Sequence, residues 1–185
     1  SGKLTNLEAE LSTSPLPESG QGIGHTRWAT HGAPTDTNAH PHVSADGTVA
    51  VVHNGIIENF AELKSELLHK GYNFVSETDT EVAATLLGDV FHNEAAGDLT
   101  KAMQLTCARL EGAFTLLAIH AEQADRIVAA RRDSPLVIGL GEGENFLGSD
   151  VSGFIDYTKS AVEMDNDQVV TITADEVEIT DYAGN

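Results

Sequence analysis

The 185-residue sequence has little cysteine, few basic residues and no long apolar run. Its single cysteine, Cys107, excludes an internal disulfide and favours a reducing compartment, the cytoplasm. Lysine and arginine number 10 against 29 aspartate and glutamate, which gives a formal net charge of −19. This balance argues against nucleic acid or an anionic membrane surface as a partner, because both attract clustered basic residues. No apolar run approaches the roughly 20 residues that cross a bilayer, and the first residues show no signal peptide.

The hydrophobic pattern predicts helices and short strands in one domain. Helices are expected at 4–11, 59–71, 79–93 and 97–112, and a short one at 151–158. Strands are expected at 22–28, 48–54, 113–120, 126–131, 135–141, 145–150, 168–175 and 176–182. This order of elements indicates an α+β fold, with two sheets and helices packed outside them.

Four of the eight histidines lie within residues 25–42, and a fifth, His53, follows closely. Zinc could in principle be bound by the side chains of His31, Asp36, His40 and His42. The spacing matches neither a helical HExxH motif nor a Cys/His finger, so a metal-dependent hydrolase is the weaker hypothesis.

Three positions have side chains that suit an amino-acid ligand. Arg27, between an expected strand and a loop, could grip a carboxylate with two hydrogen bonds, but a surface salt bridge explains it equally well. Asn54 and Gly55 could present an amide and a backbone N–H as an oxyanion hole, although a plain Asn-Gly turn is favoured on these residues alone. Asp79 could bind an ammonium group, but helix capping is the simpler interpretation.

Five segments decide between these alternatives. They read GHTRWATHG, NAHPH, VVHNGIIENF, GYNFVSETDTE and RRDSPLVIGLG, at 24–32, 38–42, 51–60, 71–81 and 131–141. Together and in this order they resemble the glutaminase domain of class II glutamine amidotransferases, in the glucosamine-6-phosphate synthase family. The resemblance covers nearly the whole chain.

The resemblance implies an N-terminal-nucleophile fold, a four-layer αββα sandwich of two antiparallel sheets between helices, with its N-terminal strands missing here. Residues 1–185 would form a single glutaminase domain, truncated at its N-terminus and without the sugar-isomerase domains. The implied reaction hydrolyses L-glutamine to glutamate and ammonia, which a sugar-isomerase domain of the same polypeptide uses to make glucosamine 6-phosphate. It implies no cofactor and no metal, a cytoplasmic location and a homodimer at full length.

The resemblance also implies roles for eight residues. Arg27 would bind the α-carboxylate of glutamine and Asp79 its α-ammonium group. The Asn54 side chain and the Gly55 backbone N–H would form the oxyanion hole. Thr30 and His31 resemble residues of a lid that covers glutamine, Trp28 resembles a tryptophan that gates ammonia passage, and His40 resembles a histidine near the hinge of the lid.

One feature of the resembling family has no counterpart in the sequence. The family's nucleophile is an N-terminal cysteine whose own α-amino group acts as the base. Ser1 is not expected to replace it, because it opens a polar segment with a helical pattern, and Cys107 is expected to be a small buried hydrophobe. We therefore expect the chain to bind glutamine without turning it over, and an open sheet edge to favour self-association. A non-catalytic pseudo-amidotransferase that only binds a ligand is the alternative.

Overall fold

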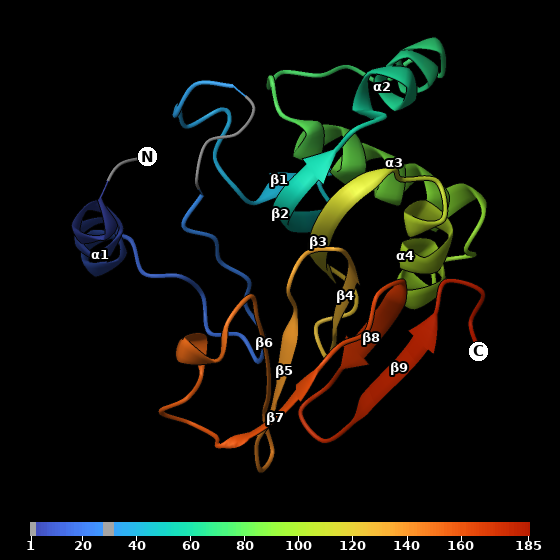
Figure 1. Ribbon diagram of the computed structural model, residues 1–185. Coiled ribbons are helices and arrows are strands. Elements are labelled where there is room, and N and C mark those ends of the chain that lie inside the picture. The colour runs from blue at the N-terminus through green and yellow to red at the C-terminus, as the bar shows by residue number, and fades with distance from the viewer. Residues whose placement is uncertain (1–2, 28–31) are drawn as a thin grey trace.

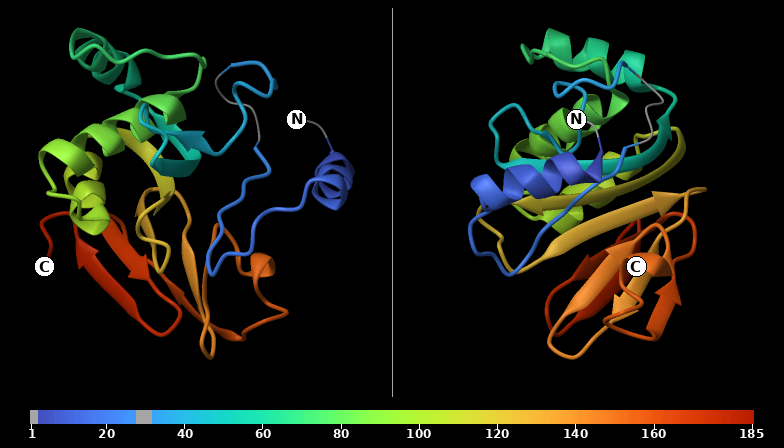
Figure 2. Two further views of the ribbon diagram at one scale, coloured as in Figure 1. Left: turned by 180° about the vertical axis from the view of Figure 1, so that it is seen from behind. Right: turned by 90° about the vertical axis from the view of Figure 1, so that its left-hand side faces the viewer.

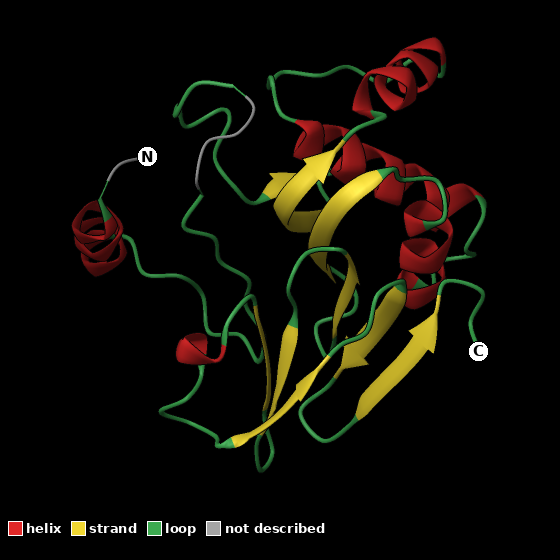
Figure 3. Ribbon diagram, viewed as in Figure 1, coloured by secondary structure: helices red, strands yellow, loops and turns green. Residues whose placement is uncertain are grey.

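The computed structural model describes residues 3–27 and 32–185, which form helices and two antiparallel sheets (Figures 1 and 3). The helices are α1 (Leu4–Thr13), α2 (Phe60–His69), α3 (Asp79–Asn93), α4 (Leu99–Cys107) and the 3-10 helix η1 (Val151–Gly153). The strands are β1 (His42–Val43), β2 (Val49–Ile57), β3 (Gly112–His120), β4 (Ile127–Arg132), β5 (Val137–Leu140), β6 (Asn145–Gly148), β7 (Ser160–Glu163), β8 (Gln168–Ile172) and β9 (Val177–Asp181).

The larger sheet has six strands in the order β1-β2-β3-β4-β8-β9, and the smaller one has the order β6-β5-β7. Every strand pair within the two sheets is antiparallel. The longest pairing joins β2 to β3 and runs from Val49 opposite His120 to Ile57 opposite Gly112. Strand β2 is therefore the second strand of the larger sheet, and only the short β1 lies along its other edge.

Helices α3 and α4 cover one face of the larger sheet, α2 packs against α3, and the smaller sheet packs against the other face of the larger one (Figure 2). Strand alternation builds both cores, because successive side chains point to opposite faces. In β4, Val128 and Ala130 join the core under the helices, while Ala129 joins the core between the sheets. In β8, Val169 and Val170 divide in the same way.

The sequence SETDTE determines where α3 begins. The hydroxyl of Thr78 accepts a hydrogen bond from the Glu81 N–H and caps the helix. The Glu81 carboxylate is buried and accepts hydrogen bonds from the backbone N–H groups of Val75 and Ser76. These contacts hold the first turn of α3, and with it Asp79 and Thr80, in one orientation.

Most expected elements are present, and the departures have local causes. The strand expected at 22–28 is wrong for residues 22–27, which form no ladder, and Arg27 has a positive φ of 25° that breaks an extended backbone. The helix expected at 97–112 ends at Cys107, so Gly112 begins β3. Only Val151–Gly153 of the helix expected at 151–158 is helical. Strand β7 was not expected, since all four of its residues are exposed.

Helix α1 stands apart from the rest of the molecule and buries none of its residues (Figure 1). In the described part of the chain, α1 and η1 are the helices outside the group formed by α2, α3 and α4. No helix among the described residues is long and apolar enough to span a membrane.

We predict that Leu86→Ala, on the buried face of α3, lowers the free energy of unfolding by about 2–5 kcal/mol, because it leaves a cavity in the core. Leu68→Ala is the matched control, since Leu68 on α2 is 50% exposed, and it should change stability by less than about 0.5 kcal/mol. Urea unfolding of both variants measures the difference. Equal losses would contradict the assignment of α3 to the core.

Candidate functional site

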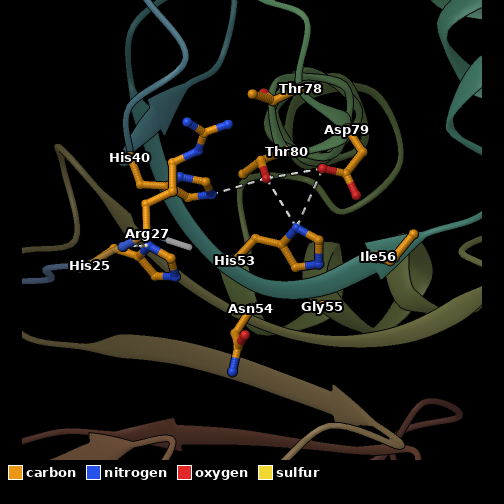
Figure 4. A pocket seen from close by; sticks show the side chains of 10 residues that line it. All are labelled: His25, Arg27, His40, His53, Asn54, Gly55, Ile56, Thr78, Asp79 and Thr80. Atoms are coloured by element: carbon orange, nitrogen blue, oxygen red, sulfur yellow. Dashed lines mark hydrogen bonds and ion pairs between the residues drawn. The ribbon is translucent and has the colours of Figure 1, made fainter. Parts of the chain in front are cut away.

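A pocket of about 270 Å³ opens where three segments meet. Its volume lies just below the roughly 300–1,000 Å³ of sites for drug-sized molecules, which suits a ligand as small as an amino acid. The walls are His25, Arg27 and His40, the second half of β2, and the first turn of α3 with Thr78 before it (Figure 4). The lining residues are His25, Arg27, His40, His53, Asn54, Gly55, Ile56, Thr78, Asp79 and Thr80.

Asp79 lies at the first position of α3 and is only 2% exposed. Its Oδ2 accepts a hydrogen bond of 2.9 Å from the backbone N–H of Ile57, at the end of β2. Its Oδ1 lies 3.4 Å from the Thr80 hydroxyl and 3.7 Å from Nδ1 of His53. The capping role that the sequence favoured belongs to Thr78, so the Asp79 carboxylate instead forms part of the pocket wall.

Strand β2 presents an open edge to the pocket. Strand β1 pairs only with Ala50 and Val51, so among the described residues no strand covers this edge further along. The Ile57 N–H points to this edge, where it meets Asp79, while the Glu58 N–H points the other way and bonds Glu111. Because N–H directions alternate along a strand, the Gly55 N–H also points to the pocket edge.

The Asn54 carbonyl accepts a hydrogen bond of 3.2 Å from the Ser134 hydroxyl. In a trans peptide the N–H of the next residue, Gly55, points opposite to that carbonyl and so away from Ser134. The Asn54 side chain extends to the other face of β2 from His53, and its amide lies 3.4 Å from the Ser149 hydroxyl (Figure 4).

Glycine is required at position 55. Its φ is +128°, and an added Cβ would lie 2.1 Å from the Ala113 carbonyl oxygen on β3. Asn54 and Gly55 therefore do not form the turn that their residue types favour, because both lie inside β2 and pair with β3. The tight pairing with β3 requires a glycine at this position. Because glycine has no side chain, Gly55 leaves the edge of β2 that faces the pocket uncovered.

Arg27 is the permanent cation of the described pocket lining. Its guanidinium donates hydrogen bonds of 3.3 Å to the backbone carbonyls of Gly32 and Ala33. Its backbone N–H donates to Nδ1 of His25 at 2.9 Å. These contacts join Arg27 to His25 on one side of it in the sequence and to Gly32 and Ala33 on the other.

Three alternate residues of the segment 38–42 fasten this loop to the start of α3. The Asn38 amide donates to Glu77 and its oxygen accepts from the Glu77 N–H. Nε2 of His40 lies 3.0 Å from the Thr80 hydroxyl, and Nε2 of His42 lies 2.9 Å from the Thr78 hydroxyl. Hydroxyl partners thus account for both histidines of the sequence HPH.

Burial favours the neutral form of His25, His40 and His42, in and beside the pocket. Burial is the largest cause that lowers the pKa of His40 to about 3, and the neighbouring His25, His42, His53 and Arg27 add to it. Burial also lowers the pKa of His25 and of His42. The rings of His25 and His40 stack with their centroids 4.4 Å apart. Because the rings of His25, His40 and His42 are neutral, they add no second positive charge beside Arg27.

The pocket brings together all five expected site residues that the structure describes, namely Arg27, His40, Asn54, Gly55 and Asp79. Trp28, Thr30 and His31 lie outside the described residues. Among the described histidine, cysteine and acidic side chains, no group of three or more could hold a metal ion.

Sequence reasoning gave no role to Thr80, His53 or His25, which also line the pocket. The first two directly adjoin Asp79 and Asn54 in the sequence, and this adjacency was the available signal. Cys107 is as expected: it is fully buried in α4 beneath the larger sheet, and burial raises the pKa of its thiol.

Comparisons with known proteins agree on one family. The family model described as a glutamine amidotransferase domain matches residues 14–183. The chain is 80% identical over 184 residues to the glutamine–fructose-6-phosphate aminotransferase (isomerizing) of Corynebacterium diphtheriae, covering 100% of this chain and 29% of that protein. It is 59% identical over 184 residues to the enzyme of the same name from Streptomyces coelicolor, covering 100% of this chain and 30% of that protein. The chain thus spans about three tenths of these relatives.

Solved structures share the fold. The glutamine phosphoribosylpyrophosphate amidotransferase of B. subtilis, complexed with ADP and GMP, matches with a TM-score of 0.69 and 23% identity over 87% of this chain and 34% of that one. A structure described as the allosteric regulatory enzyme of purine biosynthesis matches with a TM-score of 0.70 and 23% identity, over 87% of this chain and 35% of that one. The expected α+β amidotransferase fold with two antiparallel sheets is therefore confirmed.

We predict that the imidazole of His40 stays neutral in the folded chain from pH 8 down to about pH 4, because its pKa is about 3. In the unfolded chain the same group takes up a proton near pH 6.5. The stability that depends on neutral His40 is therefore complete above pH 6.5 and is lost as the pH falls toward 3. NMR titration of the histidine ring signals measures this, with a short peptide containing NAHPH as the control. A His40 signal that titrates near pH 6.5 in the folded chain would contradict the prediction.

Proposed function

Because the chain belongs to the glutamine amidotransferase domain family, we propose that its pocket binds L-glutamine and that residues 1–185 form a glutaminase domain. The charge distribution of the pocket carries this proposal. Of the described lining residues, Arg27 is the permanent cation and Asp79 the carboxylate, and they stand on different walls. A free α-amino acid carries one carboxylate and one ammonium group, so this pair of charges complements both ends of its zwitterion.

The two ends have different recognition chemistry. The guanidinium of Arg27 donates hydrogen bonds to two backbone carbonyls, and its planar fork of N–H donors has the geometry that binds a carboxylate with two hydrogen bonds. Asp79 is anchored through Oδ2, so Oδ1 is the oxygen that we assign to the ammonium group of glutamine.

The side-chain amide of glutamine would then extend along the open edge of β2. We assign the stabilisation of its carbonyl oxygen, as negative charge develops during hydrolysis, to the Gly55 N–H and the Asn54 amide. A backbone donor in a strand needs no rearrangement as the charge forms, because the pairing with β3 already holds it in place. Thr30, His31 and Trp28 would add the lid and the ammonia gate that the family resemblance implies.

The nucleophile is not among the described residues of the pocket. Cys107 cannot serve, because it is fully buried in α4 and burial raises the pKa of its thiol, which disfavours the reactive thiolate. We propose that this chain binds glutamine, and that a cysteine elsewhere in the longer polypeptide attacks it.

The finer features of the whole protein are proposals of the same kind. The relatives are named for an aminotransferase that acts on fructose 6-phosphate. By that likeness, we propose that ammonia released in this domain passes to a sugar-isomerase domain that forms glucosamine 6-phosphate. We also propose a cytoplasmic homodimer for the whole protein, needing neither metal nor cofactor.

We predict that the chain binds L-glutamine in isothermal titration calorimetry, and that Arg27→Lys weakens binding by about tenfold or more. A lysine keeps the charge but loses the two-pronged geometry that matches a carboxylate. Arg126→Lys is the control, because Arg126 pairs with the exposed Asp125 and does not line the pocket, and its affinity should equal that of the unaltered chain. Equal affinity of the Arg27 variant would remove Arg27 from the site.

We also predict that the 185-residue chain, supplied with L-glutamine at saturating concentration, releases no more ammonia than a protein-free blank. A coupled glutamate dehydrogenase assay measures the ammonia. Release above the blank would show that a nucleophile within these 185 residues does the chemistry, against the proposal. Failure of the chain to bind glutamine at all would instead overturn the proposed function itself.

A further inference from the structure

The hydroxyl of Thr80 joins the three walls of the pocket at one atom (Figure 4). Its Oγ1 lies 3.0 Å from Nε2 of His40, on the segment that follows the loop. It lies 3.0 Å from Nδ1 of His53, on β2. It also lies 3.4 Å from Oδ1 of Asp79, its neighbour on α3. Thr80 is only 1% exposed, so water does not compete for these contacts.

A hydroxyl has one proton and two lone pairs, so at most one of its three partners can receive the proton. The burial of His40 decides its part. Nδ1 of His40 is buried and has no hydrogen-bond partner among the described residues. A buried N–H without an acceptor is costlier and rarer than an unused lone pair, so the proton of His40 belongs on Nε2. His40 therefore donates to Thr80.

The remaining choice lies between Asp79 and His53. A carboxylate oxygen accepts hydrogen bonds more strongly than a ring nitrogen of histidine, so the Thr80 proton points to Asp79. Nδ1 of His53 must then carry a proton of its own and donate it to Thr80. A protonated Nδ1 also suits its distance of 3.7 Å from Asp79 Oδ1, because a bare lone pair there would face a carboxylate. The assignments at Thr80 and His53 therefore agree with each other.

We propose that Thr80 is a positioning residue of the pocket, whose hydroxyl sets His40 as the Nε2–H tautomer and His53 as the Nδ1–H tautomer while it orients Asp79. Thr80 acts on a ligand through these partners. It holds the loop that follows Arg27 by way of His40, and it holds the strand that carries Asn54 and Gly55 by way of His53. Its donated proton keeps Asp79 Oδ1 directed to the pocket, where a second lone pair remains for an ammonium group.

This inference deepens the proposed function, and it rests on that function for its effect on glutamine but not for the tautomers. The first experiment needs no ligand. Two-bond proton–nitrogen correlation spectra of the ¹⁵N-labelled chain report the tautomer of each histidine. We expect the Nε2–H form for His40 and the Nδ1–H form for His53. The opposite tautomer at either histidine in the unaltered chain overturns the inference, whatever the chain binds.

The second experiment removes the hydroxyl. Thr80→Val keeps the size and branching of the side chain, and we expect it to mix the tautomers of both histidines and to weaken L-glutamine binding by about tenfold. Thr80→Ser restores the hydroxyl and should recover both the tautomers and, to within about threefold, the affinity. Unchanged tautomers and affinity in Thr80→Val would overturn the inference.

Thr106→Val is the matched control, because Thr106 is fully buried in α4 and its hydroxyl has no hydrogen-bond partner among the described residues. We expect it to change neither the tautomers nor the affinity. If Thr106→Val altered them as much as Thr80→Val, the effect would belong to the loss of any buried hydroxyl, and the inference would fail. If the unaltered chain showed the expected tautomers but bound no glutamine, the proposed function would fail and the tautomer assignment would stand.

Discussion

The site depends on the docking of the segment 38–42 onto the start of α3. The side chains of Asn38, His40 and His42 each contact a polar group of residues 77–80. Each contact joins a segment without regular structure to a helix whose first turn is capped and buried. Without this docking, the loop with Arg27 would have no defined relation to Asp79, and the two charges would not share a pocket.

The second constraint on the site is the short distance between the backbones of β2 and β3. At Gly55 the two backbones come so close that no side chain fits between them. That closeness holds β2 in place while its other edge, beyond the short β1, stays open to the pocket. A strand edge usually invites further pairing. In this protein the Asp79 carboxylate occupies part of that edge by accepting the Ile57 N–H, and the pocket occupies the next part.

Burial limits the number of positive charges in the site. Several histidines crowd around Arg27, and protonated rings there would repel one another and the guanidinium. Desolvation lowers the pKa of His25, His40 and His42, so these rings act as hydrogen-bonding and stacking groups. The hydroxyls of Thr78 and Thr80 suit this arrangement, because a hydroxyl can accept from or donate to a neutral imidazole. In this member of the amidotransferase domain family, one arginine and one aspartate therefore stand on different walls of the pocket.

Local patterns in the sequence were sufficient for the helices α2 and α3 and for most strands, because their apolar periodicity and capping residues act over a few neighbours. The family resemblance selected Arg27, Asn54, Gly55 and Asp79. Tertiary structure alone decided how these residues are used. Residue types favour a turn at Asn54-Gly55 and a cap at Asp79, yet pairing with β3 makes the first a strand, and Thr78 takes the cap. Thr80 gained its place because three distant segments converge on its hydroxyl, and no pattern local to one segment records such a convergence.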